Sequence, residues 1–169
     1  MTPPTIPFVP LGTKLNPPAG ARRRVTREAI LERLVSDEPR RLTLVDAPAG
    51  WGKTTVLAEW AADAREQRPF AWFTVDRADN DPVRFWGYAI EALRTLEPSV
   101  GSASLAALGV SGTNPVDIVL PPLINELAAL DRRLVLVLED YHLIQSPDVH
   151  EGEAQAATAN FRLKAEATM

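Results

Sequence analysis

The chain alternates short apolar runs with amphipathic stretches, and this alternation predicts strands and helices in turn. Three apolar runs have the length of buried strands: 40–46, 70–75 and 134–138. Three stretches carry apolar residues at helical spacing: 54–66, 82–93 and the residues from Pro122 onward. Strands and helices that alternate in this way form a parallel sheet covered by helices, with ligands at the carboxyl ends of the strands. The sequence therefore predicts an α/β fold.

Local signals mark where helices begin and where the chain loops. Thr26 can cap an early helix. The apolar face of that helix holds Ile30, Leu31 and Leu34. Asp81 followed by proline is a strong helix start, because the aspartate caps the first turn and proline fits its first position. The segment 98–115 is rich in glycine and serine and predicts a loop.

Composition narrows the classes of function. The formal net charge of −4 argues against nonspecific nucleic-acid binding by the chain as a whole and leaves a local basic patch open. The absence of cysteine excludes disulfides, thiolate zinc sites and cysteine nucleophiles. The N-terminus lacks a signal-peptide pattern, and the longest apolar strand-like run, 134–138, is too short to cross a bilayer. These features predict a cytoplasmic protein with no membrane partner.

The most informative segment is Ala47-Pro-Ala-Gly-Trp-Gly-Lys-Thr-Thr55. It stands between a predicted strand and a predicted helix, which is the setting of a phosphate-binding P-loop. The pattern of such loops is G-x-x-x-x-G-K-[ST], and the chain departs from it at Ala47, which takes the place of the first glycine. A methyl group is tolerable there if the residue keeps strand-like dihedral angles.

Each residue type in this segment has a role in binding phosphate. Gly50 and Gly52 allow a tight turn that aims backbone N–H groups at phosphate oxygens. The helix that opens at Lys53 adds the positive end of its dipole. Lys53 supplies a cation for the β- and γ-phosphates, and the Thr54 hydroxyl can hold Mg²⁺. Trp51, inside the segment, either covers the phosphates or packs beneath the loop.

An acidic pair at the end of the third predicted strand can complete this chemistry. Phosphoryl chemistry on a P-loop needs a carboxylate at the tip of a neighbouring strand to hold the Mg²⁺ water shell. Glu139 stands at that place, and Asp140 could polarise an attacking water. Taken alone, the pair is better explained as the polar end of a buried strand. Beside a P-loop in the same chain, the metal-binding interpretation is favoured.

The remaining polar residues give weaker signals. Asp76, Asp79 and Asp81 lack the glycine and the glutamate of a calcium loop. We expect Asp81 as a helix cap and the other two aspartates as solvated loop acids. His142 and His150 have no cysteine partner, so we expect packed or surface histidines.

Several separated motifs together resemble a known family. In chain order they are Thr13-Lys-Leu-Asn-Pro-Pro18, Val25-Thr-Arg27 with Leu31-Glu-Arg-Leu34, the segment Ala47 to Thr55, Ala78-Asp-Asn-Asp-Pro-Val-Arg-Phe-Trp86, and Leu138-Glu-Asp-Tyr-His-Leu-Ile144. In this combination the chain resembles the large MalT-like, LuxR-type bacterial regulators of the STAND ATPase class. The resemblance runs from about residue 13 to residue 150.

The resemblance implies an ATP-binding module that acts as a switch. The positions that it implies as nucleotide contacts are Ala49, Gly50, Trp51, Gly52, Lys53, Thr54 and Thr55. Thr54 and Glu139 are implied as Mg²⁺ ligands, and Glu139 and Asp140 as the catalytic acids. Val25 and Arg27 are implied as neighbours of the base or ribose. The family commonly has Asp where this chain has Glu139, and small misplacements of a carboxylate are costly in rate, so we expect nucleotide binding ahead of hydrolysis.

The resemblance also implies a domain organisation. Residues 1–24 form an irregular proline-rich lead-in, residues 25–150 a partial P-loop NTPase domain, and residues 151–169 a divergent alanine-rich tail. The expected fold is a P-loop NTPase-type three-layer sandwich with an incomplete parallel sheet. It is incomplete because the tail lacks the apolar helix and the strand that the family inserts between the P-loop strand and the acid strand. The sensor and DNA-binding regions of the family are missing too, so we expect a truncated or frameshifted product, or one piece of a split gene.

Three functions remain open on the sequence. The first is the ATP-binding module of a transcriptional regulator, without direct DNA binding by this chain, since no helix-turn-helix is visible. The second is a stand-alone P-loop kinase or ATPase; a kinase needs cations such as Arg77, Arg84 and Arg94. The third is an inert remnant that binds no nucleotide. The sequence does not indicate an oligomeric state.

Overall fold

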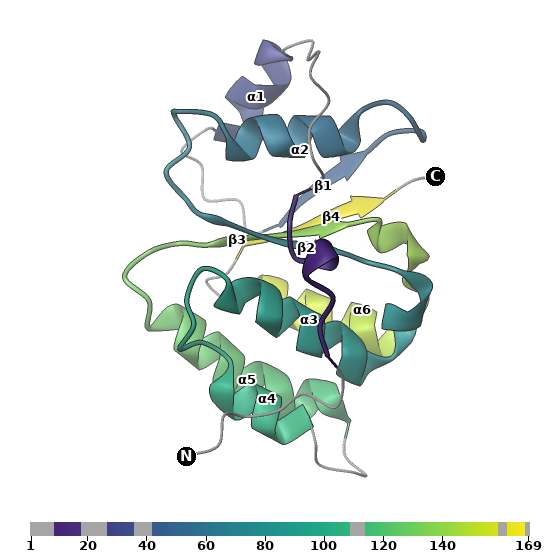
Figure 1. The fold of residues 1–169 in the computed structure, drawn as a ribbon, viewed down its shortest axis with the longest axis vertical. Coiled ribbons are helices and arrows are strands. Elements are labelled where there is room, and N and C mark those ends of the chain that lie inside the picture. The colour runs from purple at the N-terminus through teal and green to yellow at the C-terminus, as the bar shows by residue number, and fades with distance from the viewer. Residues whose placement is uncertain (1–8, 18–26, 36–41, 109–113, 159–161, 168–169) are drawn as a thin grey trace.

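The computed structural model describes residues 9–17, 27–35, 42–108, 114–158 and 162–167 (Figure 1). The helices within these ranges are α1 (Glu28–Val35), α2 (Lys53–Ala61), α3 (Pro82–Arg94), α4 (Ser102–Leu108), α5 (Pro115–Ala128) and α6 (Pro147–Thr158). The strands are β1 (Leu42–Asp46), β2 (Phe70–Thr74), β3 (Val135–Glu139) and β4 (Arg162–Ala167). Short 3₁₀ turns lie at Gly12–Lys14, Arg77–Asn80 and Tyr141–Leu143.

Helices cover both faces of a parallel sheet, which gives three layers (Figure 1). The helices α1 and α2 lie on one face, α3 and α6 lie against the other, and α4 and α5 pack on the outer side of α3 and α6. Because side chains alternate along a strand, Trp72 and Val137 pack with α1 and α2, whereas Phe73 and Leu138 pack with the opposite layer. The predicted α/β architecture with a parallel sheet is confirmed. None of the helices in the described ranges has the length and apolar character needed to span a bilayer.

The strand order β1-β4-β3-β2 corrects one prediction. Residues 162–167 lie between the first and third strands, with Ala165 opposite Leu44 of β1 and Leu138 of β3. The prediction that the alanine-rich tail supplies no strand between β1 and β3 is therefore wrong. A central parallel strand bonds through its backbone on both edges, so a short run that alternates small apolar with charged residues is enough to fill the position.

The helix before β4 corrects the same prediction, which expected no packed helix after residue 151. In α6, Val149 and Ala156 are buried, and Gly152 lies against Trp86. This buried face consists of small residues, which carry little of the hydrophobic signal on which the prediction of a helix depends.

Two helices occupy the region after α3, where the sequence predicts a loop at 98–115. The helix α4 forms inside that segment and buries Leu105. The helix α5 begins at Pro115, where the side chain of Asn114 accepts a hydrogen bond from the Val116 amide at 3.1 Å. Pro122 therefore lies inside α5 and does not start it. The asparagine–proline pair at 114–115 is the true start signal.

The predicted cap of α3 is confirmed, whereas the predicted burial of the first strand is not. Asp81 caps α3 as predicted, with its carboxylate accepting from the Val83 and Arg84 amides at 2.8 and 3.3 Å. Thr26, predicted to cap α1, lies outside the described residues. The strand β1 is less buried than its sequence predicts, because it is an edge strand paired with β4 alone. Leu42 and Leu44 are accordingly 46% and 58% exposed.

The lead-in is fixed to the end of β2 by a buried ion pair. Lys14 bonds the carboxylate of Asp79, which is fully buried, and that of Asp76 at 3.1 Å. Its ammonium also lies 4.3 Å from the ring centre of Tyr88. The prediction that Asp79 is solvated is wrong, because its partner comes from a segment 65 residues away in sequence. Burial raises the pKa of Asp76, but the hydrogen bonds from Lys14 and the Ala78 amide, together with the charges of Lys14 and Arg84, outweigh it and leave that pKa below its usual value.

We predict that Gly152→Ala destabilises the fold. A β-carbon at this position would lie 2.6 Å from a ring carbon of Trp86, so the substitution should lower the free energy of unfolding by about 1–3 kcal/mol. Urea denaturation followed by circular dichroism measures this change. Ala154→Gly, on the exposed side of the same helix, is the control for helix propensity alone. A Gly152→Ala protein that is as stable as the wild type would contradict the packing described here.

We also predict that Ala165→Pro disrupts the sheet. Proline removes a backbone donor from a strand paired on both sides, which should cost about 2 kcal/mol or more. Ala165→Ser keeps the donor and is the matched control. Thermal unfolding and binding of an apolar dye compare the two variants; equal behaviour of the proline and serine variants would argue against a central position for β4.

Candidate functional site

The segment between β1 and α2 forms a tight turn, here named the glycine loop (residues 47–52). Gly50 and Gly52 have φ angles of 80° and 76°, in the left-handed region that favours glycine. The amide of Trp51 donates to the carbonyl of Pro48 at 3.3 Å and closes the turn. Ala47 is not among the described residues with positive φ, so its methyl group brings no backbone strain. The absence of the first glycine is therefore compatible with the loop.

Lys53, the first residue of α2, folds back across the glycine loop. Its ammonium donates to the carbonyl of Ala47 at 2.8 Å and to that of Pro48 at 3.4 Å. The side chain is buried, with 7% exposure. The cation therefore lies inside the curve of the loop, beside the N-terminus of a helix, and both features favour an anion.

The acid at the end of β3 reaches the residue that follows this lysine. The Thr54 hydroxyl donates to one carboxylate oxygen of Glu139. The other oxygen accepts from the indole N–H of Trp72 at 3.1 Å and from the hydroxyl of Thr74 at 3.2 Å. Glu139 is 4% exposed, so three donors compensate a carboxylate that is almost fully removed from water. The two parts of the site predicted from the sequence meet in the structure.

Trp72 and Thr74 were not identified as site residues by the sequence. Trp72 is a core residue with 2% exposure, and its indole N–H also donates to the carboxylate. The signal lies in the pairing of β2 with β3, which places Thr74 opposite Glu139. That register is not readable before the neighbouring strands are known.

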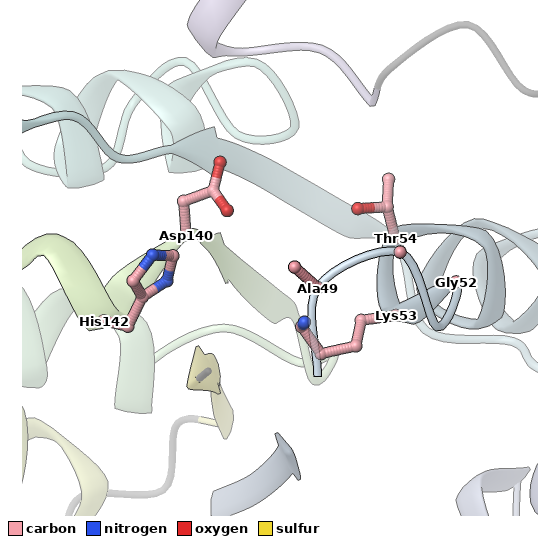
Figure 2. A pocket seen from close by; sticks show the side chains of 7 residues that line it. Ala49, Gly52, Lys53, Thr54, Asp140 and His142 are labelled. Atoms are coloured by element: carbon pink, nitrogen blue, oxygen red, sulfur yellow. The ribbon is translucent and has the colours of Figure 1, made fainter. Parts of the chain in front are cut away.

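A pocket of about 330 Å³ opens where the glycine loop faces the end of β3 (Figure 2). The residues that line this space, here named the loop pocket, are Ala49, Gly50, Gly52, Lys53, Thr54, Asp140 and His142. Asp140 and His142 lie across the gap from the loop (Figure 2). Asp140 has a φ of 57° and is the one non-glycine residue with positive φ in the described part of the chain. Such strained residues cluster at functional sites.

The two histidines differ in their placement. His142 borders the loop pocket, a position that no sequence pattern predicts. His150 instead contacts the hydroxyl of Tyr141 through Nδ1 at 2.8 Å and lines none of the pockets named here. In the described residues no group of three or more histidine, cysteine or acidic residues is arranged to hold a metal. A cation beside Thr54 and Glu139 would therefore take most of its ligands from water or from a bound phosphate, as Mg²⁺ commonly does.

A second pocket of about 380 Å³ lies beyond the glycine loop. The residues of this space, here named the tryptophan pocket, are Arg27, Ile30, Val45, Asp46, Ala47, Trp51, Lys53 and Val56. Trp51 is 66% exposed, so the alternative in which it packs beneath the loop is wrong. It also does not line the loop pocket. Lys53 lines both pockets, so they adjoin at its side chain.

Besides Trp51, two other residues implied as nucleotide contacts do not line the loop pocket. Thr55 follows Thr54 in α2 and lines neither the loop pocket nor the tryptophan pocket. Arg27 contacts the glycine loop from outside: its guanidinium donates to the carbonyl of Trp51 at 2.8 Å and to that of Gly52 at 3.2 Å. Val25 lies outside the described residues.

Two of the three arginines considered for a kinase bond other parts of the protein. Arg84 bonds the buried carboxylate of Asp79 at 3.1 Å, and Arg94 donates to the carbonyl of Val100 at 3.3 Å. Arg77 borders a further pocket that also includes His142. Among the described residues, none of these three arginines lines the loop pocket.

Comparison with known proteins agrees with the motifs. No family model matches the chain. It is 36% identical over 139 residues to the HTH-type transcriptional regulator MalT of Cronobacter sakazakii and, over the same length, 36% identical to that of Yersinia enterocolitica and 35% to that of Klebsiella pneumoniae. The matched region is 82% of this chain, whereas the chain spans about 15% of the length of these relatives. Over the matched residues, the chain is therefore a homologue of the MalT-type transcriptional regulators.

Proposed function

We propose that this chain is the ATP-binding part of a MalT-like transcriptional regulator and binds ATP with Mg²⁺ in the loop pocket. The observation that carries the proposal is the hydrogen bond between Thr54 and Glu139 at the mouth of the glycine loop. It brings together a helix N-terminus, an ammonium, a hydroxyl and a carboxylate. Few ligands other than a phosphate chain with a divalent cation use all four groups at once.

The phosphates would lie on the glycine loop. The amides around Gly50 and Gly52 and the first turn of α2 would donate to phosphate oxygens, and the Lys53 ammonium would exchange its bonds to two backbone carbonyls for bonds to phosphate. Thr54 and Glu139 would hold Mg²⁺. Bound there, the cation would bridge phosphate oxygens and neutralise part of their charge.

The long side chain of Glu139 is accommodated in this arrangement. The family commonly carries the shorter aspartate at this position, and the extra methylene moves the carboxylate. Here Trp72 and Thr74 fix one oxygen of Glu139, so that the other reaches Thr54. This supports a role for Glu139 as a metal ligand through its own geometry.

Asp140 is the candidate for polarising an attacking water, because it faces the glycine loop across the pocket (Figure 2). Hydrolysis is the secondary proposal, and binding is the primary one. In a regulator, bound nucleotide would bias one conformation of the longer protein over another.

The base would lie in the tryptophan pocket. That pocket adjoins the loop pocket at Lys53, its lining includes the aliphatic side chains of Ile30, Val45 and Val56, and it presents the exposed indole of Trp51. An aromatic ring stacks well on a nucleotide base. The phosphates and the base would thus occupy two adjoining spaces on either side of one loop.

We predict that Lys53→Ala abolishes detectable ATP binding. Loss of a cation that would contact two phosphates should weaken affinity by about 100-fold or more. Isothermal titration calorimetry with Mg-ATP measures the effect. Arg133→Ala is the control, because it removes a positive charge from an exposed position just before β3, at the other end of the strand from Glu139. This variant should bind Mg-ATP as the wild type does. Equal affinity of wild type and Lys53→Ala would end the proposal.

We predict that Trp51→Ala separates base binding from phosphate binding. Loss of the stacking surface should weaken ATP by about tenfold, and inorganic tripolyphosphate, which has no base, should bind the variant as tightly as the wild type. The comparison uses titrations of both ligands with Mg²⁺ present. An equal loss of affinity for both ligands would contradict binding of the base in the tryptophan pocket.

A further inference from the structure

Arg27 reaches the backbone of the glycine loop with two different nitrogens. Nη2 donates to the carbonyl of Trp51 at 2.8 Å, and Nη1 donates to the carbonyl of Gly52 at 3.2 Å. The planar guanidinium presents its N–H groups in a fixed fork, so it holds two consecutive carbonyls in one relative orientation. A lysine at this position would offer one point charge and no such fork.

The orientation of these carbonyls fixes the amides that follow them. In a trans peptide the C=O of one residue and the N–H of the next point in opposite directions, and no cis peptide is present in the described residues. The carbonyls of Trp51 and Gly52 point toward Arg27, so the N–H groups of Gly52 and Lys53 point away from it. Gly52 and Lys53 line the loop pocket, and Arg27 does not.

The guanidinium also closes the space on the outer side of Gly52. A β-carbon at that residue would lie 3.1 and 3.2 Å from the two terminal nitrogens of Arg27. Glycine peptides rotate more readily than others, because no side chain restricts them. Arg27 therefore bonds the carbonyls of Trp51 and Gly52 and also occupies the space beside Gly52.

Accepting the proposed function, on which this inference rests, we propose that Arg27 is a positioning residue: it holds two peptides of the glycine loop so that their amides face the phosphate chain. This differs from the role that the family resemblance implies, a direct neighbour of the base or ribose. Arg27 borders the tryptophan pocket, so either role is sterically possible. The two roles predict different effects of removing the side chain on the affinities for ATP and for a phosphate chain without a base.

The test compares Mg-ATP with Mg-tripolyphosphate in wild type, Arg27→Met and Arg27→Lys. Positioning of the amides affects any phosphate chain, so Arg27→Met should weaken both ligands by the same factor, about tenfold. Arg27→Lys keeps the charge but loses the fork, and it should remain weakened toward both. The amide resonances of Gly52 and Lys53 in ¹⁵N-correlated spectra of the ligand-free variants should shift, as a direct reading of peptide orientation.

Arg132→Met is the matched control, because Arg132 also donates to a backbone carbonyl, that of Leu96 at 2.9 Å, at a place outside both pockets. It should leave both affinities unchanged. Circular dichroism melting of each variant separates a local effect from loss of the fold.

Three results would overturn the inference. A loss of ATP affinity without a loss of tripolyphosphate affinity would assign Arg27 to the base or ribose. Full recovery of both affinities in Arg27→Lys would mean that its charge alone matters. Unchanged binding in Arg27→Met would leave Arg27 no role in the site. Failure of the wild type to bind either ligand is a different result: it refutes the proposed function, and this inference falls with it.

Discussion

The hydrogen bond from Thr54 to Glu139 joins the first turn of α2 to the end of β3. Thr54 follows β1 by way of the glycine loop, and Glu139 ends β3, while β4 separates the two strands. Two strand spacings amount to roughly 9.5 Å, so residues at the ends of β1 and β3 are too far apart to bond each other directly. The curl of the glycine loop and the length of the glutamate side chain close this distance together. The site therefore depends on β4, whose pairing with both strands sets the separation of its two halves.

Around this bond, the site is held from several directions by contacts of different kinds. Trp72 and Thr74 of β2 fix the carboxylate of Glu139, and Arg27 fixes the outer face of the glycine loop. Lys53 spans the inside of the loop. An arrangement in which donors and cation are already in place before a ligand arrives loses little free energy in ordering itself on binding. Such preorganisation is what a nucleotide switch in a much longer regulator would require of its binding part.

The sequence predicts the parts of this structure whose signals are local. The glycine loop, the start of α3 at Asp81 and the acid at the end of β3 each follow from a few adjacent residues. What the sequence misses depends on distant partners or on small side chains. Asp79 is buried with Lys14, which comes from a distant part of the chain. The strand β4 is stabilised by pairing with β1 and β3 on both sides. The helix α6 packs through small residues such as Gly152. The contact of Arg27 with the loop likewise depends on how α1 sits beside α2, which no motif records.

The attachment of the lead-in has a practical consequence for how this region is handled in isolation. Asp79 has no exposure to water, and among the described residues its charge is balanced by Lys14 and Arg84. Trimming the first 17 residues, as one would trim an irregular extension to obtain a compact fragment, removes one of these two cations and leaves the carboxylate buried with the other alone. Residues 9–17 thus belong to the folding unit, and cloning boundaries belong ahead of them.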